Sequence, residues 1–252
     1  MKVSIILPTY NERDNIIELI AAIHAALARF ESPAPPLQGD GSIRNFCYEI
    51  IVIDDNSPDG TADIVRTVFG DYDYINVHVR RTERGLATAI RHGIEQATGD
   101  IIVCMDTDFN HDPAVIPQMI KFLDFYDMVI GSRFVMRGGM EDSFRQFASA
   151  VYNFGIRIIF GTPVHENLSG FFAIYRSKLM TMDFEQIFYG YGDYFIRLIM
   201  VAWQRGYNML EVPVFYRLRK HGHSKTQFVS TLATYTNALF ILRMKLWLGR
   251  MD

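Results

Sequence analysis

The segment VCMDTDFNHDP, residues 103–113, contains the residues whose types and spacing most clearly suggest chemistry. An apolar run ends here on two carboxylates, Asp106 and Asp108, separated by one residue. Two carboxylates at the end of a buried strand repel each other unless a cation lies between them. Carboxylate oxygens suit Mg²⁺ or Mn²⁺, which also bind substrate phosphates. The alternative is that the two aspartates cap the turn before a helix at Pro113, and the pair alone does not decide between these interpretations.

Polar side chains also follow two other apolar runs. Asp54 and Asp55 come directly after EIIVI. The next helix has other candidate caps, so these two acids are not needed to cap it. An acid at this position could instead accept hydrogen bonds from a ribose or a base edge. Tyr10 follows the first apolar run and can stack on a base, with Glu12 beside it. These types of side chain indicate a nucleotide as the ligand.

The elements that must position these residues alternate along the first half of the chain. Apolar runs, typical of strands covered on both faces, are separated by segments with helical spacing, which predicts an α/β fold with a doubly wound, mostly parallel sheet and flanking helices. Ligands bind at the carboxyl ends of the strands in such sheets, where the polar clusters fall. The predicted strands are 3–7, 49–53, 74–79, 100–105, 127–132, 169–175 and 207–214, and the predicted helices are 14–27, from about 59, 86–97, 113–123, 144–158 and 194–204.

Composition excludes some classes of function. The 252 residues are 49% hydrophobic and 21% charged, which is enough apolar material for one large domain. A net charge of -3 gives no basic field for nucleic acid. Cys47 and Cys104 have no metal-ligand spacing and fit a reducing, cytosolic setting. We also expect no signal peptide and no spanning helix, and therefore a soluble or peripherally membrane-bound protein.

Two segments near the end of the chain are basic or amphipathic. RLRKHGHSK places several cations around a glycine, which suits a loop that binds an anion, although a solvated basic turn has the same composition. Residues 228–252 predict a C-terminal amphipathic helix with an apolar stripe from Phe228 to Leu246. That helix would either pack against the domain or lie at a membrane interface, which the cations near Trp247 favour.

The motifs IILPTYNERDNI, EIIVIDDNSPDGTAD, RGLATAIRHG, MDTDFNHDP, GSRF and SGFFAIYR resemble those of inverting glycosyltransferases of family 2, in particular dolichyl-phosphate (polyprenyl-phosphate) mannose synthases. The resemblance covers nearly the whole chain. It implies a GT-A type, Rossmann-like catalytic domain over residues 1–227. It also implies transfer of mannose from the nucleotide sugar GDP-mannose to polyprenyl or dolichyl phosphate, with Mg²⁺ or Mn²⁺. The alternative is another UDP- or GDP-sugar and a saccharide or lipid-linked acceptor in cell-surface polysaccharide synthesis.

The resemblance also assigns roles to individual residues. A metal-binding Asp-x-Asp matches Asp106 and Asp108, with Thr107 between them and Asn110 as a further ligand. Arg219 and Lys225 match a basic pair that closes over the diphosphate and acts in catalysis together with Asp108. The remaining positions that match nucleotide-sugar-binding residues are Pro8, Tyr10, Glu12, Ile53, Asp55 and Arg133.

The second half departs from the family pattern, which puts the acceptor in doubt. ENLSGFF has Glu166 in place of an aspartate, and Arg197 stands where a glutamate is usual. Asp193 is the candidate general base if the acceptor is a sugar hydroxyl, and a structural role such as capping the next helix is the alternative. For a lipid acceptor we expect peripheral contact with the cytoplasmic face of a membrane, with a membrane-protein partner as a further expectation.

Overall fold

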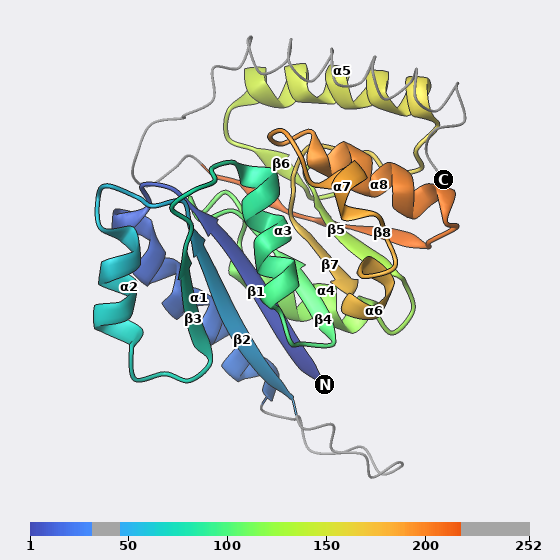
Figure 1. Ribbon diagram of the computed structural model, residues 1–252. Helices are drawn as coiled ribbons and strands as arrows, with labels where there is room; N and C mark the ends of the chain where they lie inside the picture. The colour runs from blue at the N-terminus through green and yellow to red at the C-terminus, as the bar shows by residue number, and fades with distance from the viewer. Residues whose placement is uncertain (32–45, 218–252) are drawn as a thin grey trace.

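The computed structural model describes residues 1–31 and 46–217, without side chains for 29–31 (Figure 1). The predictions made for Arg219, Lys225 and residues 228–252 lie outside the described residues.

A seven-stranded sheet forms the centre of the molecule, in the order β3-β2-β1-β4-β7-β5-β8. All neighbours pair in parallel except β7, which is antiparallel to both β4 and β5. The prediction of a mostly parallel sheet is therefore confirmed, whereas the insertion of β7 between β4 and β5 was not predicted. The strands are β1 (Lys2–Thr9), β2 (Cys47–Asp54), β3 (Ile75–Val79), β4 (Ile101–Cys104), β5 (Met128–Ser132), β7 (Phe172–Tyr175) and β8 (Met209–Pro213).

The strand order reverses at β1. From β1 the chain continues outward to β2 and β3, and then returns to place β4 on the other side of β1. In a sheet of this kind, ligands usually bind in the crevice outside the strand ends where the order reverses, so we expect the ligand beside the loops that follow β1 and β4.

Helices cover both faces of the sheet (Figure 1). Alternate side chains of β1 point to opposite faces, so that Ile5 and Leu7 join one apolar cluster while Ile6 joins the other. Gly93 lets the helix that contains it, α3 (Leu86–Gln96), approach the sheet closely, since a Cβ at this position would lie 2.5 Å from Ile6 Cγ2. The first face carries α1 (Arg13–Glu31), α2 (Thr61–Phe69), η1 (Pro113–Val115) and α4 (Ile116–Phe122), and the second carries α3 (Leu86–Gln96), α6 (Arg176–Leu179), α7 (Phe184–Ile187) and α8 (Tyr194–Gln204).

Helix α5 (Ser143–Phe160) lies apart from the sheet, along the upper side of the view in Figure 1. Asp142 caps it by accepting a hydrogen bond from the backbone N–H of Arg145, and Gly161 ends it with φ 69°. An apolar stripe of this helix faces outward: Phe144, Phe147, Val151, Phe154 and Ile158 are 57–75% exposed. Beneath α5, β6 (Gly139–Met140) pairs in parallel with β9 (Phe215–Tyr216) in a separate two-stranded sheet.

Glu49 joins the amino-terminal ends of three strands. Its carboxylate accepts hydrogen bonds from Lys2 Nζ at 2.8 Å, Ser4 Oγ at 2.6 Å and the backbone N–H of Thr98 at 2.8 Å, and its side chain is only 8% exposed. Burial raises the pKa of Glu49, but these hydrogen bonds outweigh the burial and bring the pKa from 4.5 down to about 2. The ionised form is therefore the form that stabilises the fold.

We expect Glu49→Gln to remove a pH-dependent part of the stability. Because the pKa is lower in the folded state, the stabilisation is complete above pH 4.5 and is lost as the pH falls towards 2. The shift corresponds to about 3 kcal/mol. Urea unfolding should show a larger gap in free energy of unfolding between the Glu49→Gln variant and the unaltered protein near pH 7 than near about pH 2.5. The exposed Glu185→Gln is the control, and a pH-independent gap for Glu49→Gln would contradict this account.

Candidate functional site

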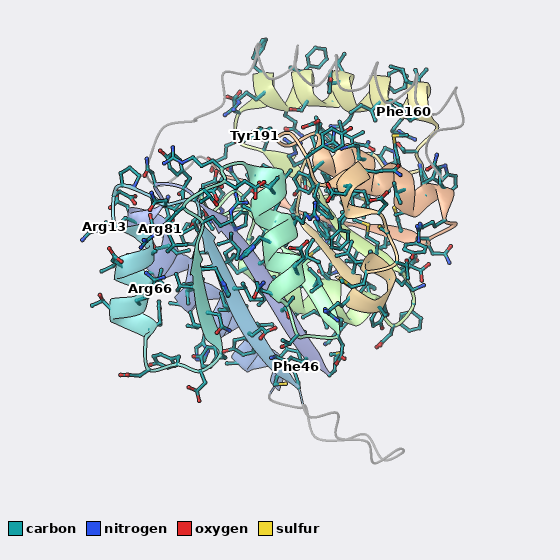
Figure 2. All side chains as sticks on the ribbon, in the orientation of Figure 1. Arg13, Phe46, Arg66, Arg81, Phe160 and Tyr191 are labelled. Atoms are coloured by element: carbon teal, nitrogen blue, oxygen red, sulfur yellow. The ribbon has the colours of Figure 1, made fainter. Side chains whose placement is uncertain are left out.

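The carboxyl ends of the parallel strands bring most of the predicted site residues to one edge. Tyr10 follows β1, Asp55 follows β2, Asp106 follows β4 and Arg133 follows β5. In Figure 2 the strands rise from the lower end of the view, where Phe46 is labelled just before β2, to this edge, which lies below α5.

The Asp106–Asp108 loop is rigidly shaped. Asp108 is buried and accepts hydrogen bonds from both the backbone N–H of Asn110 at 3.1 Å and its side-chain amide at 2.9 Å. Phe109 between them has φ 63°, a left-handed conformation that turns the chain sharply. Thr107 Oγ1 donates to the carbonyl of Pro8 at 3.4 Å, which ties the loop to the end of β1.

The capping alternative holds only for the turn: Asp108 accepts from the backbone N–H of Asn110, but neither Asp106 nor Asp108 caps the helix that begins at Pro113. Asp112 caps the short helix η1, because its carboxylate accepts from the backbone N–H of Ala114 at 2.9 Å. Asp106 and Asp108 do not supply that cap, and the side chain of Asp106 is 40% exposed.

The donor set at this loop fits a hard divalent cation. Within residues 1–31 and 46–217 no group of three or more His, Cys, Asp or Glu side chains forms a metal cluster. Mg²⁺ and Mn²⁺ do not need one, because they bind through one or two carboxylates and complete their shell with water and substrate phosphate. Asp106 and Asp108 would hold the ion. Asn110 orients Asp108 through the hydrogen bond that its side-chain amide donates to the Asp108 carboxylate.

Asp55 is held in place by other protein groups. Its carboxylate forms a buried ion pair with Arg80, at 2.7 Å from Arg80 Nε, and accepts from the backbone N–H of Gly85 at 2.8 Å. Arg80 in turn donates to the carbonyl of Gly85 at 3.0 Å. Asp54 accepts from the backbone N–H of Ser57 at 2.9 Å, so Asp54 shapes the turn that follows β2 and, as expected, does not cap the next helix, which begins at Thr61. Together these contacts hold the segment after β2 and the segment before α3 against each other beside the candidate site.

Arg84 is a candidate site residue that the sequence did not single out. Its guanidinium lies 4.7 Å from the ring centroid of Tyr10, the side chain predicted to stack on a base. This cation–π contact joins the loop after β1 to the start of α3 across the crevice. The available signal was its place directly before Gly85 in RGLATAIRHG, one of the motifs that carried the resemblance.

His111 lies beneath the Asp106–Asp108 loop and is completely buried. Nδ1 accepts a hydrogen bond from the backbone N–H of Asp106 at 2.9 Å, and Nε2 lies 2.6 Å from the hydroxyl of Tyr216. The ring stacks on Phe171 at 4.8 Å between centroids. Burial lowers the pKa of His111 to about 4, so the ring is neutral near pH 7.

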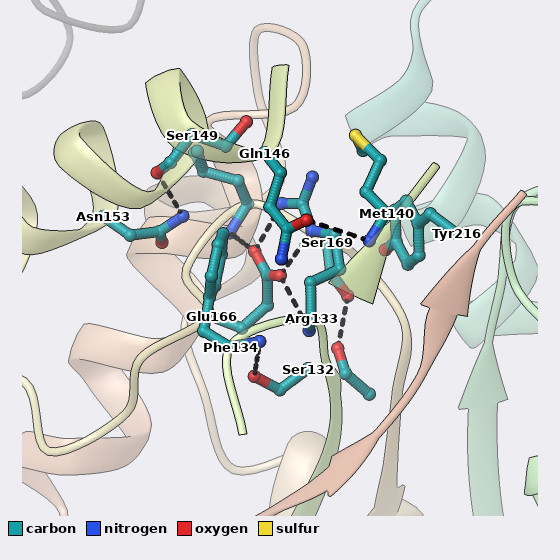
Figure 3. A network of polar contacts seen from close by, with 12 residues as sticks. Ser132, Arg133, Phe134, Met140, Gln146, Ser149, Asn153, Glu166, Ser169 and Tyr216 are labelled. Carbon is teal, nitrogen blue, oxygen red and sulfur yellow. Dashed lines mark hydrogen bonds and ion pairs between the residues drawn. The ribbon is translucent and has the colours of Figure 1, made fainter. Parts of the chain in front are cut away.

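Arg133 is neutralised by Glu166 (Figure 3). The two side chains form a bidentate pair at 2.7 and 2.8 Å, and Glu166 is fully buried. Burial alone would lower the pKa of Arg133, but Glu166 raises it above the ordinary value. The Arg133 guanidinium also lies 4.7 Å from the ring centroid of Tyr216. Glu166 therefore has a clear role as the partner of Arg133.

Asp193 forms a buried ion pair with Arg197 and accepts from the backbone N–H of Tyr191 at 2.8 Å. Arg197 also donates to the carbonyls of Ile187, at 2.9 Å, and Tyr189. Asp193 stands at the N-cap position of α8 but makes no side-chain cap there. Its structural role is thus to hold, through Arg197, the loop before α8, and the suggested capping role is wrong.

The other predicted residues differ in their accessibility to a ligand. Ile53 is fully buried in the core beneath the edge, and Pro8 is buried at the end of β1. Glu12 begins α1 through its carbonyl, which accepts from the backbone N–H of Ile16 at 2.9 Å, and is partly buried.

The fold and the site define the class of protein. A mostly parallel sheet with acidic loops at the switch point is the GT-A arrangement of glycosyltransferases. A solved glucosyl-3-phosphoglycerate synthase from Mycobacterium tuberculosis, in complex with Mn²⁺, UDP and glucosyl-3-phosphoglycerate, superposes with a TM-score of 0.66 over 96% of this chain and 79% of its own. At 20% identity that likeness shows the fold alone.

The chain belongs to glycosyl transferase family 2, whose sequence profile matches residues 4–182. It is 31% identical to a dolichol-phosphate mannosyltransferase of Pyrococcus furiosus over 100% of this chain and 66% of that protein, so it spans about two thirds of the length of that relative. It is also 28% identical to a polyprenol monophosphomannose synthase of Mycolicibacterium smegmatis, over 88% of this chain and 79% of that protein.

We expect Asp193→Asn to act mainly on stability. Removing one partner of a buried ion pair costs about 3–5 kcal/mol, because the other charge stays buried without compensation. Urea unfolding should show a loss of this order, and Arg197→Met should cause a similar one. The pH dependence of glycosyl transfer by the folded variant should be unchanged. Unaltered stability together with loss of the acidic limb of the pH–rate profile, where a general base becomes protonated, would instead identify Asp193 as a general base.

Proposed function

We propose that the protein transfers mannose from GDP-mannose to a polyprenyl phosphate, with Mg²⁺ or Mn²⁺ bound at Asp106 and Asp108. The observation that carries the proposal is the meeting of the Asp106–Asp108 loop with Tyr10 and Asp55 at the switch point of a family 2 chain. The names of the relatives support a polyprenyl phosphate as the acceptor.

In this proposal the nucleotide sugar lies across the crevice, with its base near Tyr10 and its ribose near Asp55. The cation, when bound, neutralises the negative charge that develops on the diphosphate leaving group. The protein positions the donor so that the acceptor attacks the anomeric carbon in line, with inversion. Arg219 and Lys225, outside the described residues, would stabilise the departing diphosphate.

A phosphate acceptor removes the need for a general base. The second pKa of a phosphate monoester is about 6, so the acceptor is already largely dianionic at neutral pH. A sugar hydroxyl would have to lose a proton during attack. Asp193, the base predicted for that alternative, is engaged by Arg197, and this contact favours the phosphate acceptor.

Asp108→Asn should lower transfer by a factor of about 10²–10³, the size of effect that follows loss of one electrostatic group at a reacting centre. The assay measures labelled mannose that passes from GDP-mannose into the butanol-soluble lipid, with Mn²⁺ or Mg²⁺ and with or without polyprenyl phosphate. Asp112→Asn is the matched control, since an asparagine retains the cap of η1.

Lipid-dependent label that disappears in Asp108→Asn and persists in Asp112→Asn supports the proposal. Label that does not depend on the lipid, or hydrolysis of a different nucleotide sugar in its place, would contradict it and favour a saccharide acceptor.

We further infer that α5 contacts a membrane surface. No helix in residues 1–31 or 46–217 has the length and apolar character needed to cross a bilayer. A polyprenyl phosphate is carried by a membrane, so this acceptor brings the site close to a membrane surface. The exposed phenylalanines of α5, together with Arg145 and Arg157 on the same helix, match an interfacial helix that binds anionic lipid. The two free cysteines fit the cytoplasmic face, and a membrane-protein partner stays a prediction.

The double substitution Phe147→Ser with Phe154→Ser should weaken binding to vesicles that contain phosphatidylglycerol by about 100-fold or more, because each buried phenylalanine contributes about 1.5–3 kcal/mol. Co-sedimentation measures the effect. Phe125→Ser, at a side chain 79% exposed after α4, is the control. Equal binding by all three proteins would exclude α5 as the contact.

A further inference from the structure

The buried contacts of His111 connect the candidate metal loop to the chain that leads out of the described residues. Tyr216 lies in β9, where its carbonyl accepts from the backbone N–H of Glu141 at 3.0 Å. Its ring lies under the Arg133 guanidinium. In the sequence it precedes Arg219 by only three positions. His111 thus stands between Asp106 and the start of the segment with the predicted basic pair.

The hydrogen bonds of His111 fix which ring nitrogen carries the proton. The backbone N–H of Asp106 can only donate, so Nδ1 must accept and the proton of the neutral ring lies on Nε2. Nε2–H then donates to the hydroxyl of Tyr216 at 2.6 Å. Nε2 also lies 3.8 Å from the Oδ2 of Asp106, so the same ring faces both the backbone and the carboxylate of this residue.

This ring has little freedom to move. It is 0% exposed, with Phe171 stacked on one face and the ring of Tyr216 packed against it at 64°. A rotation of the ring would leave the part-buried backbone N–H of Asp106 without its acceptor, which costs up to about 1–3 kcal/mol. The orientation of the Asp106 backbone is therefore coupled to that of His111.

We propose that His111, oriented by Tyr216, is a positioning residue that sets the geometry of the Asp106–Asp108 loop for a divalent cation. The inference rests on the proposed function, since it concerns the same metal site. His111 does not bind the ion; it supplies the acceptor that holds Asp106, in the way that outer-shell partners orient metal ligands. The contact with Tyr216 links the loop to the chain that leads towards Arg219.

Two substitutions at His111 separate the two hydrogen bonds. In His111→Asn the side-chain oxygen occupies the place of Nδ1, so the acceptor for Asp106 is kept and the donor to Tyr216 is lost. In His111→Gln the terminal amide reaches the place of Nε2, so the donor is kept and the acceptor for Asp106 is lost. Tyr216→Phe removes the hydroxyl while it retains the ring beneath Arg133.

The measurement is the dissociation constant of Mn²⁺ with GDP present, followed by the paramagnetic resonance of free Mn²⁺, alongside thermal unfolding of each variant. His111→Gln should weaken Mn²⁺ binding by about 10- to 100-fold, the effect typical for loss of an outer-shell partner. His111→Asn and Tyr216→Phe both keep the acceptor for Asp106 and lose the same contact between His111 and Tyr216, so both should weaken Mn²⁺ binding less than His111→Gln does.

A purely structural role predicts another pattern. All three variants would then unfold at lower temperature while their folded forms bound Mn²⁺ with unaltered affinity, which would overturn the inference. Equal losses of affinity in His111→Asn and His111→Gln would also overturn it. If the unaltered protein transferred mannose with a metal but the variants showed no difference, only this inference would fail. If it neither bound Mn²⁺ nor transferred mannose, the proposed function would fail with it.

Discussion

The pairing of β1 with both β2 and β4 is the constraint on which the site depends. In the register of β1 and β4, Ile6 faces Cys104, so the chain beyond Cys104 leaves the sheet beside the last residues of β1. In the register of β1 and β2, Thr9 faces Asp54, so Tyr10 and Asp55 leave it at the same level. A slip of one residue would turn each side chain to the opposite face. Backbone hydrogen bonds far from any ligand therefore determine where the acids and the tyrosine meet.

The charges around this edge are mostly compensated within the protein. Asp55 pairs with Arg80, Arg133 with Glu166 and Asp193 with Arg197, and all six side chains are buried. Buried pairs of this kind add little net stability, because desolvation offsets most of the attraction, but each is costly to break. The first two pairs hold loops that follow β2 and β5, and the third holds the loop before α8. Asp106 differs from them, because its side chain is 40% exposed.

The sequence was sufficient to predict the α/β sheet, the family and the edge at which the site lies, because these follow from apolar periodicity and short motifs. The helix 194–204 was placed at the observed bounds of α8. The position of β7 was not predictable, since an antiparallel insertion depends on pairing between distant segments. The roles of His111, Arg84 and Glu166 were missed for the same reason: their partners Tyr216, Tyr10 and Arg133 lie 105, 74 and 33 positions away. The outward direction of the apolar face of α5 was not predictable either, because periodicity shows that one face is apolar and not what covers it.

These features together define what the proposed acceptor must bring to the site. Asp193 is committed to Arg197, which leaves this carboxylate poorly suited to remove a proton. An acceptor that arrives already ionised meets this condition, but it must approach a donor diphosphate that is also anionic. Arg133 cannot supply the whole compensation, because Glu166 already neutralises it. The proposed chemistry therefore needs positive charge from two further sources, a divalent cation at Asp106 and Asp108 and the basic segment that follows Tyr216. His111 contacts Asp106, in the loop that would hold the cation, and Tyr216, which precedes the basic segment. A buried, neutral histidine therefore contacts the chain beside both proposed sources of positive charge.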